Sequence, residues 1–351
     1  MALRPINIAG REVGPDCSCF IIAEAGVNHN GSAESARQLI DVAAQAGADA
    51  VKFQTFKAER VVTLDAPKAA YQLRNTEVAE SQYEMLRRLE LSPEAHRDLM
   101  NYCSERGILF MSTPFDEESA DFLSELGVSV FKLPSGEITN LPFIKHVARK
   151  GKPLIVSTGM SYLNEVAVAV RAINDADNRE LALLHCVSNY PAAAGDVNLR
   201  AMLTMREAFN LPVGYSDHTD GIEVAVAAVA MGACIIEKHF TLSRDLPGPD
   251  HRASLEPDEL SAMVRSIRRV EAALGNGRKE PAASEMETAR VARRSLVAAR
   301  DIAAGTELTE DLIAIRRPGT GLPATMLSEV VGRTLRVPVS AGALFTLEML
   351  G

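Results

Sequence analysis

The sequence predicts an α/β protein, in which a parallel (β/α)8 TIM barrel is followed by a small β-rich domain. Eight short apolar runs occur within the first 241 residues, and each ends in polar or ionisable side chains. They are residues 20–28, 50–56, 108–115, 130–137, 153–160, 181–188, 211–219 and 234–241. Amphipathic stretches of helical spacing separate most runs, so the repeating unit is a strand followed by a helix. The carboxyl ends of the strands in such a barrel open on one face, where active sites lie.

The helices expected around this barrel have recognisable ends. A helix after the first run is expected to begin near Ser32 and to stop at Gly47. After the eighth run, apolar residues of helical spacing predict the last helix of the barrel: Leu260, Met263, Val264, Ile267, Val270 and Leu274. Glycines follow this helix directly, so we expect the barrel domain to span residues 1–274.

Residues 57–91, after the second run, interrupt the regular repeat with a long, charged segment. Long loops of this kind are usually functional lids or disordered segments. Because this one follows the carboxyl end of a strand, we expect it to form a lid over a substrate.

The carboxyl-terminal part is expected to form a separate domain. Residues 275–287 (GNGRKEPAASEME) are polar and contain proline, which is typical of a linker. Residues 288–351 contain an internal near-repeat at one constant offset, in which Ile302, Ala304, Gly305, Leu308, Thr309 and Leu312 match Val339, Ala341, Gly342, Phe345, Thr346 and Met349. This predicts a duplicated, compact β-rich unit with glycine turns. Between the two halves, the stretch RRPGTG (316–321) is either a solvated turn or a functional loop.

The bulk composition excludes several classes of function. The formal net charge is -9 and no long basic run occurs, so we expect no nucleic-acid partner. The five cysteines lack a CxxC spacing, which indicates reduced thiols and neither a disulfide framework nor a zinc ribbon. There is no apolar signal core at the amino terminus and no apolar stretch long enough to span a bilayer. We therefore expect a cytoplasmic protein without a membrane partner.

Two histidines, His218 and His239, end neighbouring strands and could bind one divalent metal ion together. Two protein ligands leave coordination positions for water or substrate, as a catalytic metal requires. Acidic residues at the same barrel mouth favour a cation there: Glu24, Glu137, Asp217, Glu237 and Asp250. The alternative is that each histidine is a hydrogen-bonded structural residue.

Lys52 and Lys132 also follow apolar strands, so both ammonium groups could converge on the barrel mouth. Hydroxyl and glycine backbone groups at other strand ends would complete a cradle for phosphate or carboxylate: Thr113, Ser135, Ser157, Ser216, Gly136 and Gly159. A lysine could instead form a Schiff base with a carbonyl substrate, but that chemistry needs no metal, and the paired histidines count against it.

Eight motifs, in order, resemble the sialic acid synthase family. They are IIAEAGVNHNGS (21–32), VKFQTFKAE (51–59), MSTPFD (111–116), FKLPSGEITN (131–140), STGM (157–160), GYSDHT (214–219), EKHFTL (237–242) and PGPDH (247–251). The carboxyl-terminal part, including RRPGTG, resembles the antifreeze-like (SAF) domain, a β-clip fold, that follows the barrel in that family. Together these resemblances cover nearly the whole chain.

The resemblance implies a condensation of phosphoenolpyruvate with the open-chain form of an N-acetylated mannosamine-type sugar, which yields a nonulosonic acid and phosphate. It implies a divalent metal, Mn²⁺ or Mg²⁺, on His218 and His239, and a catalytic carboxylate at Glu24. The implied phosphoenolpyruvate site consists of Lys52, Thr113, Lys132, Ser135, Ser157, Gly159 and Ser216. The implied sugar site consists of Gln54, Asn75, Tyr190, Asp250 and Arg317, and we also expect substrate contacts from Phe115, Glu137 and Ser188. The family's SAF domain is swapped across a homodimer, so Arg317 would reach the partner's barrel.

Residues 52–72 and 80–91 resemble the bacterial legionaminic acid synthases more than enzymes dedicated to N-acetylneuraminate. The acceptor would then be a 2,4-diacetamido-2,4,6-trideoxymannose. Ser188, where some neuraminate synthases have asparagine, is consistent with a changed sugar contact. Three alternatives stay open: an N-acetylneuraminate synthase that uses N-acetylmannosamine, a barrel that condenses phosphoenolpyruvate with an aldose phosphate, and an inactive carbohydrate-binding barrel.

Overall fold

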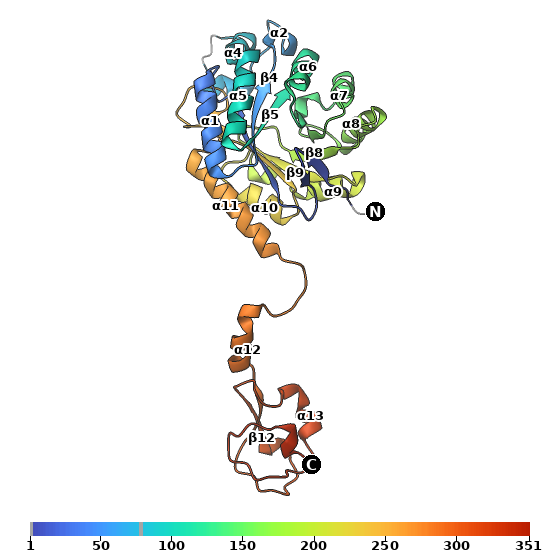
Figure 1. The fold of residues 1–351 in the computed structure, drawn as a ribbon, viewed down its shortest axis with the longest axis vertical. Helices are drawn as coiled ribbons and strands as arrows, with labels where there is room; N and C mark the ends of the chain where they lie inside the picture. The colour runs from blue at the N-terminus through green and yellow to red at the C-terminus, as the bar shows by residue number, and fades with distance from the viewer. Residues whose placement is uncertain (1–2, 77–79) are drawn as a thin grey trace. The chain divides into compact units, whose positions relative to one another are not determined.

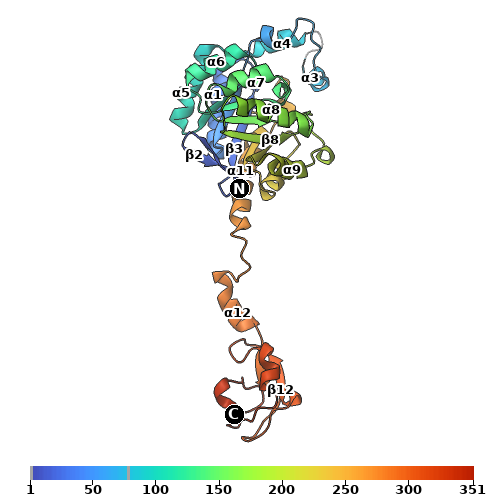
Figure 2. The same cartoon turned by 90° about the vertical axis from the view of Figure 1, so that its right-hand side faces the viewer.

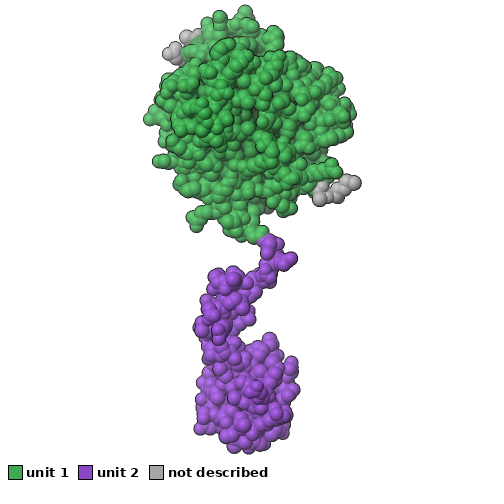
Figure 3. Space-filling view, in the orientation of Figure 1, with its two compact units in different colours: residues 1–275 green, residues 276–351 purple. Residues whose placement is uncertain are grey.

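The computed structural model describes residues 3–76 and 80–351, and the chain divides into two compact units between Gly275 and Asn276 (Figure 3). The first unit is built around eight parallel strands. They are β3 (Phe20–Gly26), β4 (Ala50–Thr55), β5 (Leu109–Pro114), β6 (Phe131–Leu133), β7 (Leu154–Ser157), β8 (Leu181–Cys186), β9 (Val213–Asp217) and β10 (Ile235–His239). Each strand lies within one of the eight apolar runs, which confirms the predicted barrel.

The strand pairing brings the two ends of the barrel sequence together. The sheet order is β5-β4-β3-β10-β9-β8-β7-β6, and β6 packs beside β5 to bring the two edges together. The last strand pairs with the first in parallel, so that His239 lies opposite Glu24, and Glu237 of the same strand lies opposite Ser216 of β9. All the strands therefore present their carboxyl ends at the same mouth.

Helices cover the outside of this barrel (Figure 1). The covering helices are α1 (Ala33–Ala46), α5 (Pro93–Arg106), α6 (Glu117–Leu126), α7 (Leu141–Ala148), α8 (Leu163–Asp175), α9 (Arg200–Phe209), α10 (Glu223–Ala230) and α11 (Pro257–Leu274). The predicted ends of α1 are confirmed, because the Ser32 hydroxyl accepts the Ser35 N–H and Gly47 ends the helix with φ of 80°. In α11 the predicted apolar face is buried as far as Ile267, whereas Leu274 is exposed. None of the helices in the described part of the chain is long and apolar enough to cross a membrane.

The amino end of the barrel is closed by a hairpin that the sequence pattern did not predict. It consists of β1 (Ile6–Ile8) and β2 (Arg11–Val13), which pair antiparallel. Ile6, Ile8 and Val13 are buried against the apolar residues that point into the barrel. Side chains thus fill the amino end of the barrel interior among the described residues.

The segment after β4, predicted as a lid, contains three short helices: α2 (Ala58–Val61), α3 (Ala70–Asn75) and α4 (Gln82–Leu89). Figure 2 shows α3 and α4 at one end of the barrel, and residues 77–79 of this segment lie outside the described residues. Met85 and Leu89 of α4 pack with Val27 and Phe56, which follow β3 and β4. The segment is thereby anchored on the barrel by an apolar cluster of its own.

The second unit is a small antiparallel structure with its own apolar core. It contains α12 (Met286–Ala292), β11 (Ser295–Ala298), β12 (Ile313–Arg316) and α13 (Leu327–Val330). The near-repeat is visible in the backbone, because Ile302 pairs with Val339, and Gly305 and Gly342 both have positive φ. A 3-10 helix follows at the same place in each half, η5 (Glu310–Leu312) and η7 (Leu347–Met349). Residues 286–287, at the end of the expected linker, begin α12.

Candidate active site

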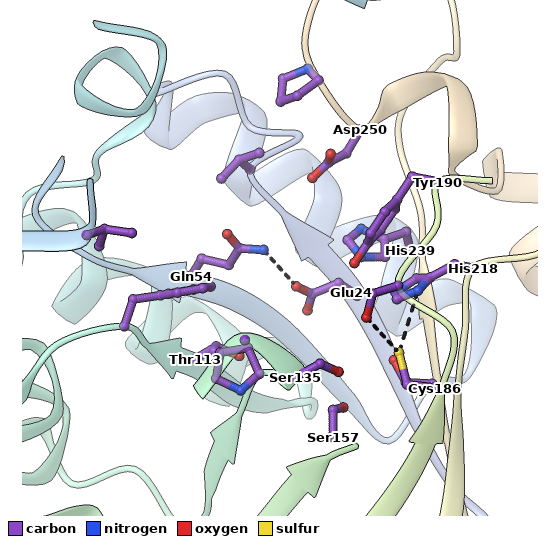
Figure 4. Close-up of a pocket in the computed structure, with 18 of the residues that line it drawn as sticks. Glu24, Gln54, Thr113, Ser135, Ser157, Cys186, Tyr190, His218, His239 and Asp250 are labelled. Carbon is purple, nitrogen blue, oxygen red and sulfur yellow. Dashed lines mark hydrogen bonds between the residues drawn. The ribbon is translucent and has the colours of Figure 1, made fainter. Parts of the chain in front are cut away.

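A cavity of about 360 Å³ lies at the carboxyl ends of the barrel strands. Most residues that the sequence selected line it: Glu24, Lys52, Gln54, Thr113, Phe115, Lys132, Ser135, Ser157, Ser188, Tyr190, Ser216, His218, His239 and Asp250. Figure 4 shows Glu24 near the centre of this group, with Tyr190 and the two histidines on one side and Ser135 and Ser157 below. Side chains from most strands therefore share one space.

Four selected residues do not line the cavity. The Asn75 side-chain amide donates to the carbonyl of Pro249 at 2.8 Å, so it ties α3 to the loop after β10. Glu137 accepts from the Asn140 side chain at 2.7 Å. The Gly159 N–H donates to the hydroxyl of Ser135, a lining residue, at 3.0 Å. Arg317 belongs to the second unit.

The floor of the cavity is a network of buried charges. Lys52 Nζ lies 2.6 Å from Glu24 Oε2 and 3.6 Å from Glu237 Oε2, and it donates to Thr113 Oγ1 at 3.0 Å. Lys132 Nζ lies 3.6 Å from the other oxygen of Glu237. All four charged residues are at most 5% exposed. Because two lysines face two carboxylates, the burial of each charge is offset by an opposite one.

The two carboxylates of the floor differ in proton affinity. Burial tends to raise the pKa of Glu237, but Lys132 and Lys52 outweigh it and lower that pKa to about 2. Burial raises the pKa of Glu24 to about 7, and the nearby charge of Glu237 adds to the effect while Lys52 opposes it. Burial lowers the pKa of Lys132, whereas for Lys52 the two carboxylates outweigh burial and raise the pKa. Glu237 is thus a fixed anion, and Glu24 can exchange a proton near neutral pH.

One edge of the cavity carries the two histidines, whose ring centroids are 5.4 Å apart. His218 Nδ1 lies 2.7 Å from the carbonyl oxygen of Val187, which can only accept, so Nδ1 holds the proton and Nε2 keeps a lone pair. His239 Nδ1 is buried without a hydrogen-bond partner among the described residues. Burial, with the neighbouring His218, lowers the pKa of His239 well below its usual value, which keeps that ring neutral. Around His218 burial lowers the pKa, but Cys186 and the Val187 carbonyl outweigh it and raise the pKa, so this ring offers Nε2 to a metal ion once it has lost its second proton. Neutral imidazoles are suitable metal ligands.

The same edge includes Tyr190, whose ring lies against that of His218 with centroids 4.1 Å apart and planes tilted by 34°. Asp250 lies above Glu24 in Figure 4, and its carboxyl group points into the cavity. Burial raises the pKa of Asp250 to about 6. Within the described part of the chain, no group of three or more His, Cys, Asp or Glu side chains could hold a metal ion, so the two histidines would leave open coordination positions.

The wall opposite the charged floor is apolar and comes from the lid segment. It is formed by Val61, Val62, Met85, Leu86 and Leu89. We did not select these residues from the sequence, although the spacing of 85, 86 and 89 on one face of α4 was a usable signal. Gln72 and Gln82 of the lid segment also line the cavity and were not selected. Two further polar residues were not assigned a role of their own, although Glu237 was counted among the acidic residues of the mouth. They are Glu237, which the motif EKHFTL contains, and Cys186, whose Sγ lies 3.7 Å from His218 Nδ1.

Comparison with known proteins gives relatives that match nearly the whole chain. An N,N'-diacetyllegionaminic acid synthase from Legionella pneumophila is 50% identical over 94% of each chain. One from Campylobacter jejuni is 49% identical over 90% of this chain and 95% of that protein. The human N-acetylneuraminate-9-phosphate synthase is 38% identical over 94% of this chain and 92% of its own length.

A crystal structure and two family models agree with these relatives. The N-acetylneuraminic acid (sialic acid) synthetase of Leptospira borgpetersenii, in complex with citrate, superposes with a TM-score of 0.72 at 37% identity and covers 81% of this chain and 95% of that chain. The NeuB family model matches residues 39–279, and the SAF domain model matches residues 293–351. These matches confirm the resemblance of the eight motifs. The chain belongs to the NeuB family and carries a carboxyl-terminal SAF domain.

Proposed function

We propose that this protein condenses phosphoenolpyruvate with 2,4-diacetamido-2,4,6-trideoxymannose to give N,N'-diacetyllegionaminate and phosphate. The observation that carries the proposal is one cavity that holds two buried lysines, a carboxyl group of pKa about 7 and two facing histidines. The names of the Legionella and Campylobacter relatives, at 50% and 49% identity, support this acceptor.

The floor of the cavity provides the groups that a phosphoenolpyruvate trianion needs. Lys52 and Lys132 supply two positive charges, of which Glu237 offsets only part. The Ser157 hydroxyl is buried without a hydrogen-bond partner among the described residues, so it is free to bond an anionic oxygen. Charge-assisted hydrogen bonds from these groups would hold the phosphate during C–O cleavage.

The histidine edge fits a divalent cation, Mn²⁺ or Mg²⁺. Its donor set is His218 Nε2 and the unpartnered Nδ1 of His239. When bound there, the ion would act as a Lewis acid that polarises the aldehyde of the sugar. Tyr190, whose ring lies against His218, and Asp250 above Glu24 are positioned to orient the sugar beside it.

Glu24 is the proposed proton acceptor of the reaction. As C3 of phosphoenolpyruvate attacks the aldehyde carbon, C2 becomes electron-poor, and a nearby carboxylate stabilises it. Water then adds to C2 and its proton passes to Glu24, which can return it to the alkoxide that forms from the aldehyde oxygen. The tetrahedral intermediate loses phosphate by C–O cleavage, and the C2 hydroxyl gives up its proton, to the leaving phosphate or to water, to become the keto group. Gln54, whose amide donates to Glu24 Oε1 at 3.4 Å, and Lys52 at 2.6 Å hold the carboxyl group in place.

Acceptor preference is the most direct test of this function. The apolar wall on the lid suits a 6-deoxy methyl group and a second acetamido methyl group. We expect kcat/KM for the diacetamido trideoxy sugar to exceed that for N-acetylmannosamine by at least about tenfold. This is the lower end of the discrimination that one methyl group gives in an apolar pocket. Phosphate release in the presence of Mn²⁺ measures both reactions.

The lid itself provides a matched pair of variants for this test. Leu86→Asn on the wall should reduce the preference, whereas Leu73→Asn at an exposed site of the same lid should not. A preference for N-acetylmannosamine would contradict the proposed acceptor. Release of no phosphate with either sugar would contradict the synthase function as a whole.

We also propose a homodimer in which Arg317 of each SAF domain completes the partner's sugar site. The support is the SAF domain match and the RRPGTG stretch, which contains the two neighbouring cations Arg316 and Arg317. Glu24→Gln and Arg317→Ala chains should each be poorly active alone. Mixed at equal amounts and allowed to exchange, they should recover about a quarter of wild-type activity, because half of the dimers would contain one complete site. Absence of recovery in heterodimers verified by mass would contradict the swap.

A further inference from the structure

Behind the histidine edge lies a buried ion pair that the proposed reaction does not use. Lys238 Nζ is 2.8 Å from Asp217 Oδ2, and both residues are 1% exposed. Successive side chains of a strand point to opposite faces, and Ser216, Glu237 and His239 line the cavity. Asp217 and Lys238 therefore lie on the outer side of the barrel. Each is the chain neighbour of one histidine, His218 or His239.

The pair belongs to a closed ring of hydrogen bonds around the turn that carries His218. Asp217 Oδ1 accepts from the Thr219 N–H at 2.9 Å and from the Thr219 hydroxyl at 2.8 Å. Lys238 donates to the Thr219 carbonyl at 2.5 Å as well as to Asp217. A side chain of β10 thus bonds both residues that flank His218 at the end of β9, the side chain of Asp217 and the backbone carbonyl of Thr219.

Further bonds fix the two histidines from their other sides. The carbonyl of His218 accepts the Ala192 N–H at 2.8 Å, and its ring donates to Val187. His239 lies in register with Glu24, and its carbonyl accepts the Leu255 N–H at 2.9 Å. The backbone ladder of β9 and β10 already pairs Lys238 with Asp217, and the Ser216 hydroxyl donates to Glu237 on the cavity side at 3.0 Å. The Asp217–Lys238 ion pair adds a side-chain link on the outer side, and through Thr219 it extends this link past the end of the ladder to the turn that carries His218.

Stability alone does not explain two charges at this position. Buried ion pairs in proteins can often be replaced by apolar residues of similar volume without loss of stability, because the pair must offset the desolvation of both charges. The outer layer of the barrel around Tyr215 and Ile236 is otherwise apolar. An ion pair fixes the distance and the direction between two strand ends, whereas an apolar contact does not.

We propose that Asp217 and Lys238 are positioning residues that set the separation and orientation of the His218 and His239 rings for a divalent cation. This inference rests on the proposed metal role of the two histidines. Since the pair contacts neither Lys52 nor Lys132, it acts on the metal edge and not on the phosphoenolpyruvate floor.

The test uses the full-length double variant Asp217→Leu/Lys238→Met, which removes both charges and so leaves neither one unpaired. Calorimetric titration of the metal-free protein should give a Kd for Mn²⁺ that is about 10- to 100-fold higher than that of the wild type, the usual loss when a residue supporting a ligand is removed. The Kd for phosphoenolpyruvate should not change. Ile173→Ala, a core truncation in α8, is the control for general destabilisation and should leave both constants unchanged.

A second readout needs no metal. In the wild type, the His218 Nδ1 proton bonded to Val187 should give an imidazole N–H signal protected from exchange in ¹⁵N-histidine spectra, and the double variant should lose that protection. If Mn²⁺ binds the wild type no better than it binds the His218→Ala variant, the proposed metal role of the two histidines fails. The imidazole N–H signal then still tests whether Asp217 and Lys238 hold the His218 ring in place.

The remaining outcomes are also decisive. A folded double variant with unchanged Mn²⁺ affinity and an unchanged imidazole signal would overturn the inference. If the double variant does not fold, Asp217→Asn, which keeps an acceptor for Thr219 but loses the charge, carries the same measurements. Misfolding of both variants would also overturn it, because the pair would then be needed for the barrel itself.

Discussion

Replacement of Glu24 by Gln is expected to lower kcat by about 10²- to 10⁴-fold, the range that a positioned proton acceptor contributes. Gln keeps the shape of the side chain but cannot take the proton of the attacking water. The affinity for phosphoenolpyruvate should stay equal or rise, because one competing anion is removed from Lys52, which lies 2.6 Å from Glu24. Steady-state kinetics and calorimetric titration with phosphoenolpyruvate measure the two effects separately.

The chain offers a matched control for this substitution. Glu137 lies on the same face of the barrel but bonds Asn140 and does not line the cavity, so Glu137→Gln should change kcat by only a few-fold. Equal losses in the two variants would show that Glu24 acts through general electrostatics. A proportional loss of phosphoenolpyruvate affinity in Glu24→Gln would assign this residue to binding.

The pH profile of the wild type gives Glu24 a second signature. A base must be deprotonated to act, and burial raises the pKa of this carboxyl group to about 7. The value of kcat/KM should therefore be constant above that pH and fall as the pH drops through it, by up to about tenfold per unit. In Glu24→Gln this acid limb should disappear or move toward the pKa of Asp250, about 6. An unchanged limb in the variant would contradict the proton-acceptor role.

The barrel could be predicted because its signals are local. Each strand is a short apolar run with a polar end, and helix ends such as Ser32 and Gly47 use capping chemistry that a few adjacent residues determine. The hairpin of β1 and β2 could not be predicted in this way, since strands of three residues are too short to show a period. Long-range contacts stabilise it: burial against the inner core of the barrel, the ion pair of Arg11 with Asp49, and the bond from the Asn7 N–H to Glu180.

The sequence predicted most of the residues that line the candidate site, but it could not predict the pKa values of their ionisable groups. The rule that active sites occupy strand carboxyl ends selected Glu24, and Glu237 was noted at another strand end. Nothing in the sequence distinguishes the two carboxylates, because their pKa values, about 7 and about 2, depend on the distances to Lys52 and Lys132. For Asn75 the sequence predicted the wrong contact. A sugar contact was expected of this residue, but its side chain bonds the backbone carbonyl of Pro249.

Removal of the metal is expected to have an effect comparable to the loss of Glu24. A Lewis acid at the aldehyde is worth several kcal/mol of transition-state stabilisation, so chelation should lower kcat by about 10³-fold or more, and Mn²⁺ should restore it. His218→Ala and His239→Ala should each weaken Mn²⁺ binding, since each removes one of the two proposed protein ligands. Titration of the metal-free protein, followed by activity at saturating Mn²⁺, separates lost affinity from lost chemistry.

Another histidine of the barrel provides the control for these two variants. His185 on β8 bonds the Val197 carbonyl and does not line the cavity, so His185→Gln should keep full Mn²⁺ affinity. Activity that survives chelation, together with trapping of Lys52 or Lys132 by borohydride, would replace this mechanism with Schiff-base chemistry. The geometry opposes that alternative for Lys52, because the buried carboxylates raise its pKa when a Schiff-base lysine needs it lowered. An ammonium group held in this way is suited to bind an anion and poorly suited to attack a carbonyl. Burial lowers the pKa of Lys132, so Lys132 is the lysine that the trapping experiment has to exclude.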